Sequence, residues 1–138
     1  MNHPLTDAEA RQYSPLALAF LGDSVYDTMM RDYILRSANR SAAQLHTLKI
    51  QRVCAAYQAA AADRILPELS EEEETVYKRG RNATGNTVPK HAHAADYHKA
   101  TGLEALFGFL YLTGAEERLQ ALFDIICQAD AELFNKEC

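Results

Sequence analysis

The spacing of apolar residues along the chain predicts helices and no strands. Apolar positions recur three and four residues apart, which is the period of an amphipathic helix, and no segment shows the two-residue alternation of a half-buried strand. We expect helices over residues 6–12, 15–36, 41–63, 70–80, 96–113 and 115–135. The chain of 138 residues is long enough to bury one core, so the sequence predicts an all-α helical bundle that forms one domain over residues 1–138.

Capping signals support several of these helix boundaries. Thr6, Ser41 and Ser70 are each followed three residues later by Glu or Gln, the spacing of a capping box. Pro15 is suited to the first position of the second helix, where a missing N–H costs nothing. Gly80 follows a run of basic residues and is expected to end the helix that begins at Ser70.

Two acidic residues interrupt the most apolar helices. Asp23 lies in LALAFLGDSVYD and Glu104 in TGLEALFGFLYLTG, and each has a glycine close by. A helix that is apolar all round is normally buried, and an ionised carboxylate is costly to bury unless it meets a cation, a metal or several hydrogen-bond donors. We therefore expect Asp23 and Glu104 to share one site. The alternative is that each carboxylate caps a helix or pairs with an arginine.

The net charge of −5 is unevenly distributed along the sequence. Residues 33–62 contain four Lys or Arg residues and no acid, and residues 76–99 contain five against the single acid Asp96. The acids are concentrated in residues 71–74 and 116–137. This segregation predicts a positive face that could bind a polyanion, despite the acidic total.

Candidate nucleic-acid contacts fall in these two basic regions. Three of them recur every third residue on one predicted helix, and the others flank the start of RNATGNTVPKHAHA, a non-periodic segment at residues 81–94, or lie within it. A loop of this length in a small domain is typically functional or disordered. The alternative for the helical stripe is an ordinary solvated helix face. The candidates are His46, Lys49, Arg52, Arg79, Arg81, Asn82 and Lys90.

The sequence contains no sign of export or membrane insertion. No apolar run reaches the roughly 20 residues that span a bilayer. The start, MNHPLTDAEARQY, has neither a basic leader nor an apolar signal core. We therefore expect a cytoplasmic protein.

The motifs also resemble a known family. AFLGDSVYD resembles the signature helix of the ribonuclease III family, and LEALFGFLYLTG resembles its second acidic helix. The ordered set PLALAFLGDSVYD, QLH, EEEE, RGRNA, TVPK and LEALFGFLYL is most similar to Mini-ribonuclease III, the short bacterial branch of that family. The match covers roughly residues 14–114, and the chain is accordingly expected to lack the double-stranded-RNA-binding domain of the longer members.

The resemblance implies a function and several residue roles. It implies a homodimeric endoribonuclease that uses Mg²⁺ to cut double-stranded RNA, leaving a 3′-hydroxyl and a 5′-phosphate, in the maturation of large-subunit ribosomal RNA ends. By the same resemblance, Asp23 and Glu104 are catalytic acids that bind the metal, and Phe20 lies in the dimer interface. Two carboxylates, waters and an RNA phosphate oxygen can satisfy Mg²⁺.

The sequence departs from the longer family members at three acidic positions, where it has Leu16, Ala19 and Thr101. Fewer carboxylates are then available as direct metal ligands. Asp27, one helical turn after Asp23, could hold a metal-bound water, but we expect it to pair with a cation instead. Two other functions remain open: an inactive module of the same fold that binds RNA or a ribosome-assembly partner, and an all-α metal-dependent nucleotide hydrolase.

Overall fold

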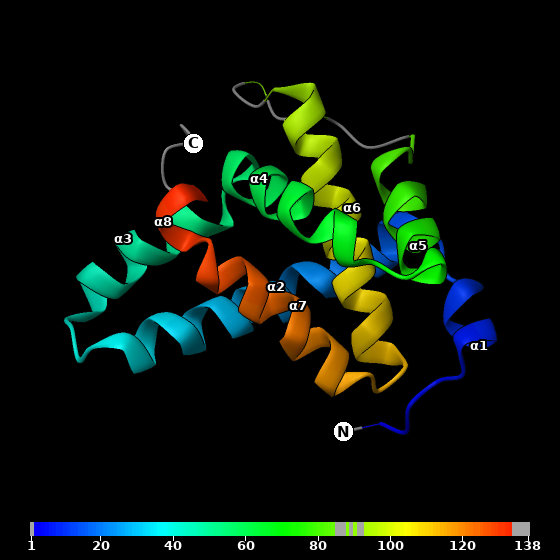
Figure 1. Cartoon of the computed structure of the whole chain (residues 1–138), viewed down its shortest axis with the longest axis horizontal. Helices are drawn as coiled ribbons and strands as arrows, with labels where there is room; N and C mark the ends of the chain where they lie inside the picture. Colours follow the sequence, from blue (N-terminus) through cyan, green and yellow to red (C-terminus); the bar gives the residue numbers. More distant parts are fainter. Residues whose placement is uncertain (1, 85–87, 89, 91–92, 134–138) are drawn as a thin grey trace.

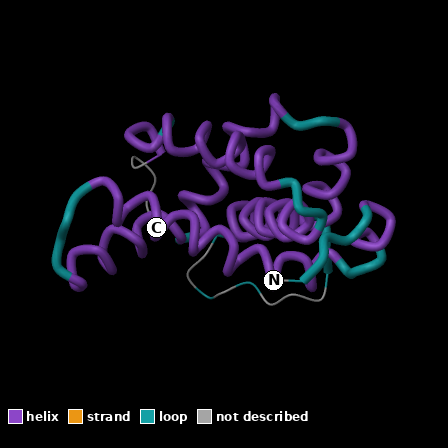
Figure 2. Tube along the Cα trace, turned by 90° about the horizontal axis from the view of Figure 1, so that it is seen from below, coloured by secondary structure: helices purple, strands orange, loops and turns teal. Residues whose placement is uncertain are grey.

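The described part of the structure, a computed structural model, comprises residues 2–84, 88, 90 and 93–133. Within these residues the chain forms helices joined by loops and contains no strand, so the all-α prediction is confirmed (Figure 2). The elements are α1 (Asp7–Arg11), α2 (Pro15–Ser37), α3 (Ala42–Val53), α4 (Ala55–Ile65), the 3₁₀ helix η1 (Leu66–Glu68), α5 (Glu71–Arg81), α6 (Ala94–Leu112), α7 (Glu116–Gln128) and α8 (Asp130–Leu133). None of the described helices is long and apolar enough to cross a membrane.

The predicted helix starts that carry a capping residue are confirmed, because these caps are local. Thr6, Ser41 and Ser70 each form a complete capping box with the residue three positions later. The Ser14 hydroxyl accepts a hydrogen bond from the Ala17 N–H at 3.1 Å. Each cap satisfies backbone donors that the first helical turn leaves free.

The predicted helix over residues 41–63 is wrong in one respect, because it is broken at Cys54. Cys54 has an extended backbone, with φ −70° and ψ 156°, and separates α3 from α4. The break frees the carbonyl of Val53, which accepts a hydrogen bond from Gln58 Nε2 at 2.9 Å. No glycine or proline marks this position, so the sequence carried no local signal for the break.

Two other predicted helix ends differ from the structure. Gly80 does not end a helix but lies inside α5, where a Cβ atom would come within 2.7 Å of the Ala105 Cβ on α6. Gly80 therefore allows α5 and α6 to pack closely against each other. The predicted helix over residues 115–135 is interrupted at Ala129, which separates α7 from α8, and residues 134–135 lie outside the described part of the chain.

Helix α6 forms the centre of the fold, and α1, α2, α4, α5 and α7 contact it (Figure 1). From Ala100 to Leu110 every residue of α6 is buried except Glu104, which is half-buried. A helix that is apolar on all sides requires neighbours on all sides. Glu104 is thus the one carboxylate on the most enclosed stretch of this helix.

Helices α2 and α6 cross with their backbones in contact. A Cβ atom on Gly22 would lie 1.6 Å from the carbonyl oxygen of Glu104, and a Cβ atom on Gly108 would lie 2.1 Å from the carbonyl oxygen of Leu18. Neither position can therefore accept any side chain without separating the helices. The crossing places the residues that follow Gly22 next to Glu104.

Arg52 belongs to a buried cluster that joins three parts of the chain. It is only 7 % exposed, and its guanidinium donates to both carboxylate oxygens of Asp130, at 3.1 and 3.0 Å. The Tyr57 hydroxyl also donates to Asp130, and the Tyr26 hydroxyl donates to the Arg52 carbonyl at 2.7 Å. The prediction that Arg52 lies on an exposed RNA-binding stripe is therefore wrong, because this side chain ties α8 to the end of α3.

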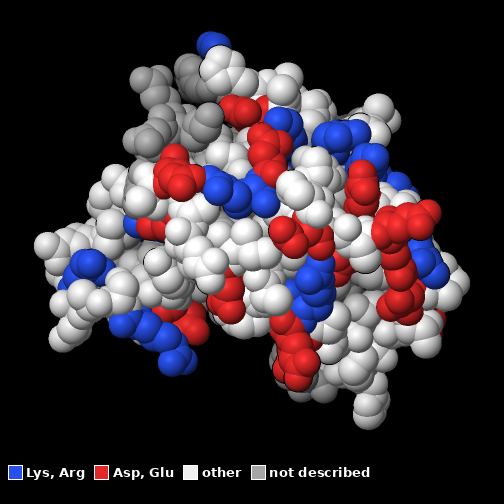
Figure 3. All heavy atoms as spheres, in the orientation of Figure 1, with Lys and Arg blue, Asp and Glu red and all other residues white. Residues whose placement is uncertain are grey.

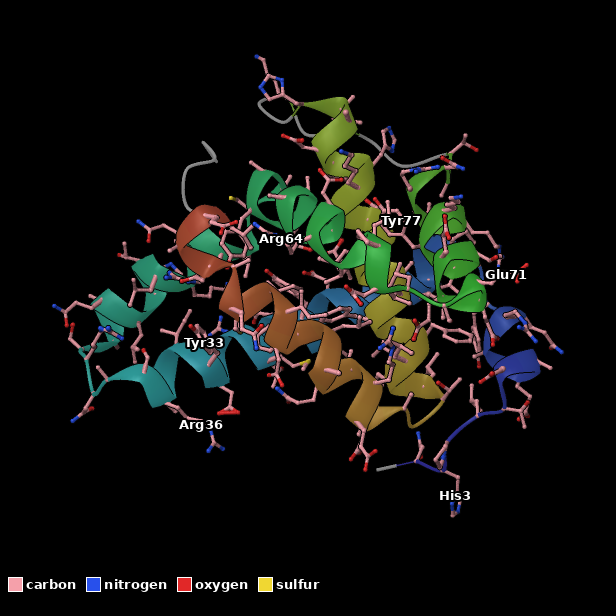
Figure 4. All side chains as sticks on the ribbon, in the orientation of Figure 1. His3, Tyr33, Arg36, Arg64, Glu71 and Tyr77 are labelled. Atoms are coloured by element: carbon pink, nitrogen blue, oxygen red, sulfur yellow. The ribbon has the colours of Figure 1, made fainter. Side chains whose placement is uncertain are left out.

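Replacing Arg52 with alanine should strongly destabilise the protein. The change leaves the Asp130 carboxylate without its guanidinium partner in a largely buried position, which costs about 3–5 kcal/mol of unfolding free energy. Urea denaturation measures this loss. Arg36→Ala is the matched control, since Arg36 pairs with Asp32 on the surface and projects away from the protein (Figure 4), and it should leave stability nearly unchanged. Equal stability of the two variants would contradict a structural role for Arg52.

Candidate active site

Asp23 and Glu104 lie side by side although 81 positions of sequence separate them. Asp23 follows the glycine at which α2 touches α6, and Glu104 supplies the backbone oxygen at that contact. Their carboxyl groups are close enough to share a hydrogen bond. The predicted proximity of the two acids is confirmed, and the helix crossing is its physical cause.

The two carboxyl groups differ in burial. Glu104 is half-buried beneath the crossing, whereas Asp23 is exposed, so the expectation that Asp23 is buried is wrong. Helix α2 contacts α6 along one side and leaves Phe20, Asp23 and Ser24 on its free side. The pair therefore combines one enclosed carboxyl group with one that solvent and ligands can reach.

Burial and charge both disfavour ionisation of Glu104. Desolvation is the largest cause, followed by the negative charge of Asp23 and a hydrogen bond between the two carboxyl groups, and together they raise the pKa of Glu104 to about 8. A hydrogen bond from Gln58 acts in the opposite direction. Among the described residues, no ion pair joins Asp23 or Glu104 to a Lys, Arg or His side chain. The pair is thus an arrangement that a bound cation would stabilise.

The ligand atoms of this pair fit a hard divalent cation. They are carboxylate oxygens, which Mg²⁺ prefers, and Mg²⁺ is commonly bound by one or two carboxylates while waters and a phosphate fill the other positions. In the described part of the chain no third His, Cys, Asp or Glu completes a cluster with them. At the positions where longer family members have further acids, Leu16 is half-buried and Ala19 and Thr101 are buried. The site is therefore a sparse, two-carboxylate site.

Gln58 is a residue of this site that the sequence reasoning missed. It lies on α4, is 3 % exposed, donates a hydrogen bond to the Val53 carbonyl, and lies near enough to the Glu104 carboxyl group to lower the pKa of that group. The available signal was a single amide within the apolar run AAYQAAAA. Buried polar side chains normally have hydrogen-bond partners, so an isolated glutamine on a packed face indicates a polar neighbour on another helix.

Asp27 is not available to this pair. Its carboxylate accepts a hydrogen bond from Arg31 Nε at 2.7 Å and pairs with Lys49 Nζ at 3.4 Å. The expectation that Asp27 pairs with a cation is confirmed. Lys49 is correspondingly half-buried against α2 rather than free on the surface.

The remaining basic candidates fall into two separate groups. His46 is exposed on α3, whereas Arg79 and Asn82 are exposed at the end of α5, and Figure 1 shows these helices on opposite sides of the molecule. Arg81 is half-buried over the Tyr77 ring, 5.7 Å from its centroid, and its Nε donates to Asn82 Oδ1 at 3.2 Å. Lys90 is exposed.

The expected positive face is absent from the side of the described molecule drawn in Figure 3, where basic and acidic side chains alternate. The reason is pairing between segments. Lys99 of α6 pairs with Asp63 of α4 at 3.0 Å, and Arg52 of α3 pairs with Asp130 of α8 at 3.0 Å. Folding thus brings acids from other segments onto cations that the sequence had separated from them.

Comparison with known proteins agrees with this architecture. The Ribonuclease III domain family matches residues 16–115, which include both acids of the pair. A protein named Mini-ribonuclease 3 from Thermoanaerobacter sp. (strain X514) is 41 % identical over 93 % of this chain and 90 % of its own length. Another of that name from Symbiobacterium thermophilum is 43 % identical over 88 % of this chain and 91 % of its own length.

The fold has a solved counterpart. A crystal structure of a protein from Fusobacterium nucleatum superposes with a TM-score of 0.81 at 32 % identity, covering 91 % of this chain and 99 % of the other. The family match and the relatives together confirm the resemblance found in the sequence motifs. This all-α chain, with two acids held together where α2 crosses α6, therefore belongs to the ribonuclease III family.

Proposed function

We propose that this protein is an endoribonuclease that hydrolyses double-stranded RNA with Mg²⁺ bound by Asp23 and Glu104. The observation that carries the proposal is the pair of adjacent carboxyl groups, one enclosed and one exposed, with no cationic partner among the described side chains. Membership of the ribonuclease III family and similarity to proteins named Mini-ribonuclease 3 support the substrate class and the reaction.

The geometry of the pair suits phosphodiester hydrolysis. When bound, Mg²⁺ activates water for attack and neutralises charge that develops on the phosphate. Glu104 is fixed by its burial on α6, so its carboxylate provides a rigid ligand, whereas the exposed Asp23 carboxylate lies where a backbone phosphate can approach. Attack of water on phosphorus breaks the bond to the 3′ oxygen and leaves a 3′-hydroxyl and a 5′-phosphate.

RNA binding is assigned to the candidate side chains that the structure does not bury. A-form RNA presents phosphates and 2′-hydroxyls rather than readable base edges, so recognition is mainly of shape. Arg52 is removed from the proposed contacts because it is buried against Asp130. The remaining set consists of side chains that are exposed or half-buried, namely His46, Lys49, Arg79, Arg81, Asn82 and Lys90. Following the family resemblance, the proposed natural substrate is a precursor of large-subunit ribosomal RNA.

We also assign a homodimer to this protein, with Phe20 at its interface. Phe20 is 84 % exposed on the free side of α2, next to Asp23. Beside it lies an apolar groove between α2 and α7, lined in part by Leu21, Val25, Met29 and Leu119. An aromatic side chain this exposed next to a hollow apolar surface favours self-association, which would cover both.

Removing either carboxylate should abolish cleavage without unfolding the protein. Asp23→Asn and Glu104→Gln keep the side-chain shape but remove a charged metal ligand, so chelator-sensitive cutting of labelled duplex RNA should fall by at least about a hundredfold. Asp32→Asn, the same change at a surface position of α2, should cut normally. Single-stranded RNA and a nucleoside triphosphate should remain intact throughout.

The same assay separates the competing functions. Duplex binding without cutting by the wild-type protein would favour an inactive RNA-binding module. Cleavage of the nucleoside triphosphate instead of duplex RNA would favour a nucleotide hydrolase. Normal cutting by one of the two active-site variants would remove that residue from the site.

Truncating Phe20 should weaken the dimer. Phe20→Ala removes the apolar surface proposed to lie at the interface, and the dissociation constant of the dimer, measured by sedimentation, should rise at least about tenfold. Leu35→Ala is the control, because Leu35 is also an exposed apolar side chain of α2 but lies near the other end of the helix. An unchanged dimer in Phe20→Ala would place Phe20 outside the interface.

The metal-free protein should lose stability as the pH rises. Folding raises the pKa of Glu104 from its ordinary 4.5 to about 8, so the stability linked to its protonation is present below pH ~4.5 and is lost as the pH rises through about 8. Urea denaturation with chelator at pH 5 and pH 9 should show an extra loss of about 2–4 kcal/mol in wild type relative to Glu104→Gln. Parallel pH profiles for the two proteins would contradict this shift.

A further inference from the structure

We propose that Gln58 is a positioning residue of the active site, holding the Glu104 carboxylate with its amide N–H and accepting, at Oε1, a hydrogen bond from a water bound to the divalent cation. This inference rests on the proposed metal site at Asp23 and Glu104. It adds a residue from α4 to a site otherwise built from α2 and α6.

The orientation of the Gln58 amide group is fixed by the helix break at Cys54. The break leaves the Val53 carbonyl without a helical partner, and Gln58 Nε2 donates to it at 2.9 Å. A carbonyl can only accept, so this contact identifies which end of the amide is the nitrogen. The same side chain lies beside the Glu104 carboxyl group, whose pKa it lowers, and only 3 % of Gln58 is exposed.

The other end of the amide is the unusual feature. Gln58 Oε1 is buried and has no hydrogen-bond partner among the described residues. A buried acceptor without a donor is unfavourable, and native structures rarely contain one without a reason. Because Oε1 and Nε2 share one carbon atom, this oxygen lies close to the carboxylate that Nε2 approaches.

A hydrated cation supplies the missing donor. The Gln58 oxygen and the ionised carboxylates of Asp23 and Glu104 are all hydrogen-bond acceptors. Together they offer a bound ligand no hydrogen-bond donor. Mg²⁺ keeps several of its waters when few protein ligands bind it, and each water offers two O–H groups. Outer-shell contacts of this kind orient the direct ligands and contribute to metal affinity.

The competing role for Gln58 is purely structural, namely to satisfy the Val53 carbonyl at the α3–α4 junction. Both roles predict some loss of stability when the side chain is replaced. Only the positioning role predicts a change in metal affinity in the absence of RNA. Metal binding is therefore the decisive measurement.

Isothermal titration of Mg²⁺ into RNA-free protein tests the proposal. Gln58→Met preserves length and apolar packing but removes both amide groups, and the dissociation constant for Mg²⁺ should rise about tenfold or more. Tyr57→Phe is the matched control, since it removes a hydroxyl that bonds Asp130 from the adjacent position of α4. This control should lower the unfolding temperature and leave Mg²⁺ affinity unchanged. Affinity of Gln58→Met within twofold of wild type would overturn the proposal.

The metal-site proposal itself is tested separately by Asp23→Asn. If wild type binds Mg²⁺ and Asp23→Asn does not, the site stands, and the result for Gln58→Met then decides the role of Gln58 alone. If Asp23→Asn binds Mg²⁺ as wild type does, the metal site fails and the role of Gln58 fails with it.

A second measurement covers the case in which Gln58→Met does not fold. In ¹⁵N-labelled wild-type protein, the side-chain amide resonances of Gln58 should shift on addition of Mg²⁺, because the cation changes the hydrogen bonding of the whole amide group. The same resonances should stay in place in Asp23→Asn. No shift in wild type at saturating Mg²⁺ would overturn the proposal without any substitution at Gln58.

Discussion

The contact between the backbones of α2 and α6 is the constraint on which the rest of this structure depends. At Gly22 and Gly108 the two helices approach so closely that a single Cβ atom would overlap a carbonyl oxygen of the other helix. This approach brings Asp23 against Glu104, two carboxyl groups that repel each other if both ionise without a cation. The packing of α6 among five other helices holds the pair together against that repulsion.

Glu104 and Asp23 differ in burial, and this difference gives each carboxylate a different role in the proposed metal site. Glu104 is the only residue from Ala100 to Leu110 that is not buried, and it is held on the most enclosed helix of the protein. Asp23 is exposed on the free side of α2, in the same stretch as Phe20. One helix therefore carries both the accessible metal ligand and the aromatic side chain assigned to the dimer, so assembly and catalysis would involve the same surface.

The break between α3 and α4 also shapes the site, because it leaves a backbone carbonyl that binds Gln58. Without the extended residue Cys54, the two helices would continue as one, as the apolar pattern predicted, and the Val53 carbonyl would have a helical partner. With the break, Gln58 bonds that carbonyl and also reaches Glu104. The nearby Arg52–Asp130 contact then ties α8 to the end of α3 beside the junction. A residue selected as an RNA contact by its spacing is thereby part of the scaffold.

The sequence by itself determined the all-α class, the capped helix starts, the two acids and the family, because each of these depends on residues a few positions apart or on the order of motifs. The tertiary structure alone decided that Asp23 is exposed, that Arg52 is buried against Asp130, and that Gln58 joins the site. These outcomes depend on where helices distant in sequence cross, and a helical period shows which residues share a face but not which helix covers that face.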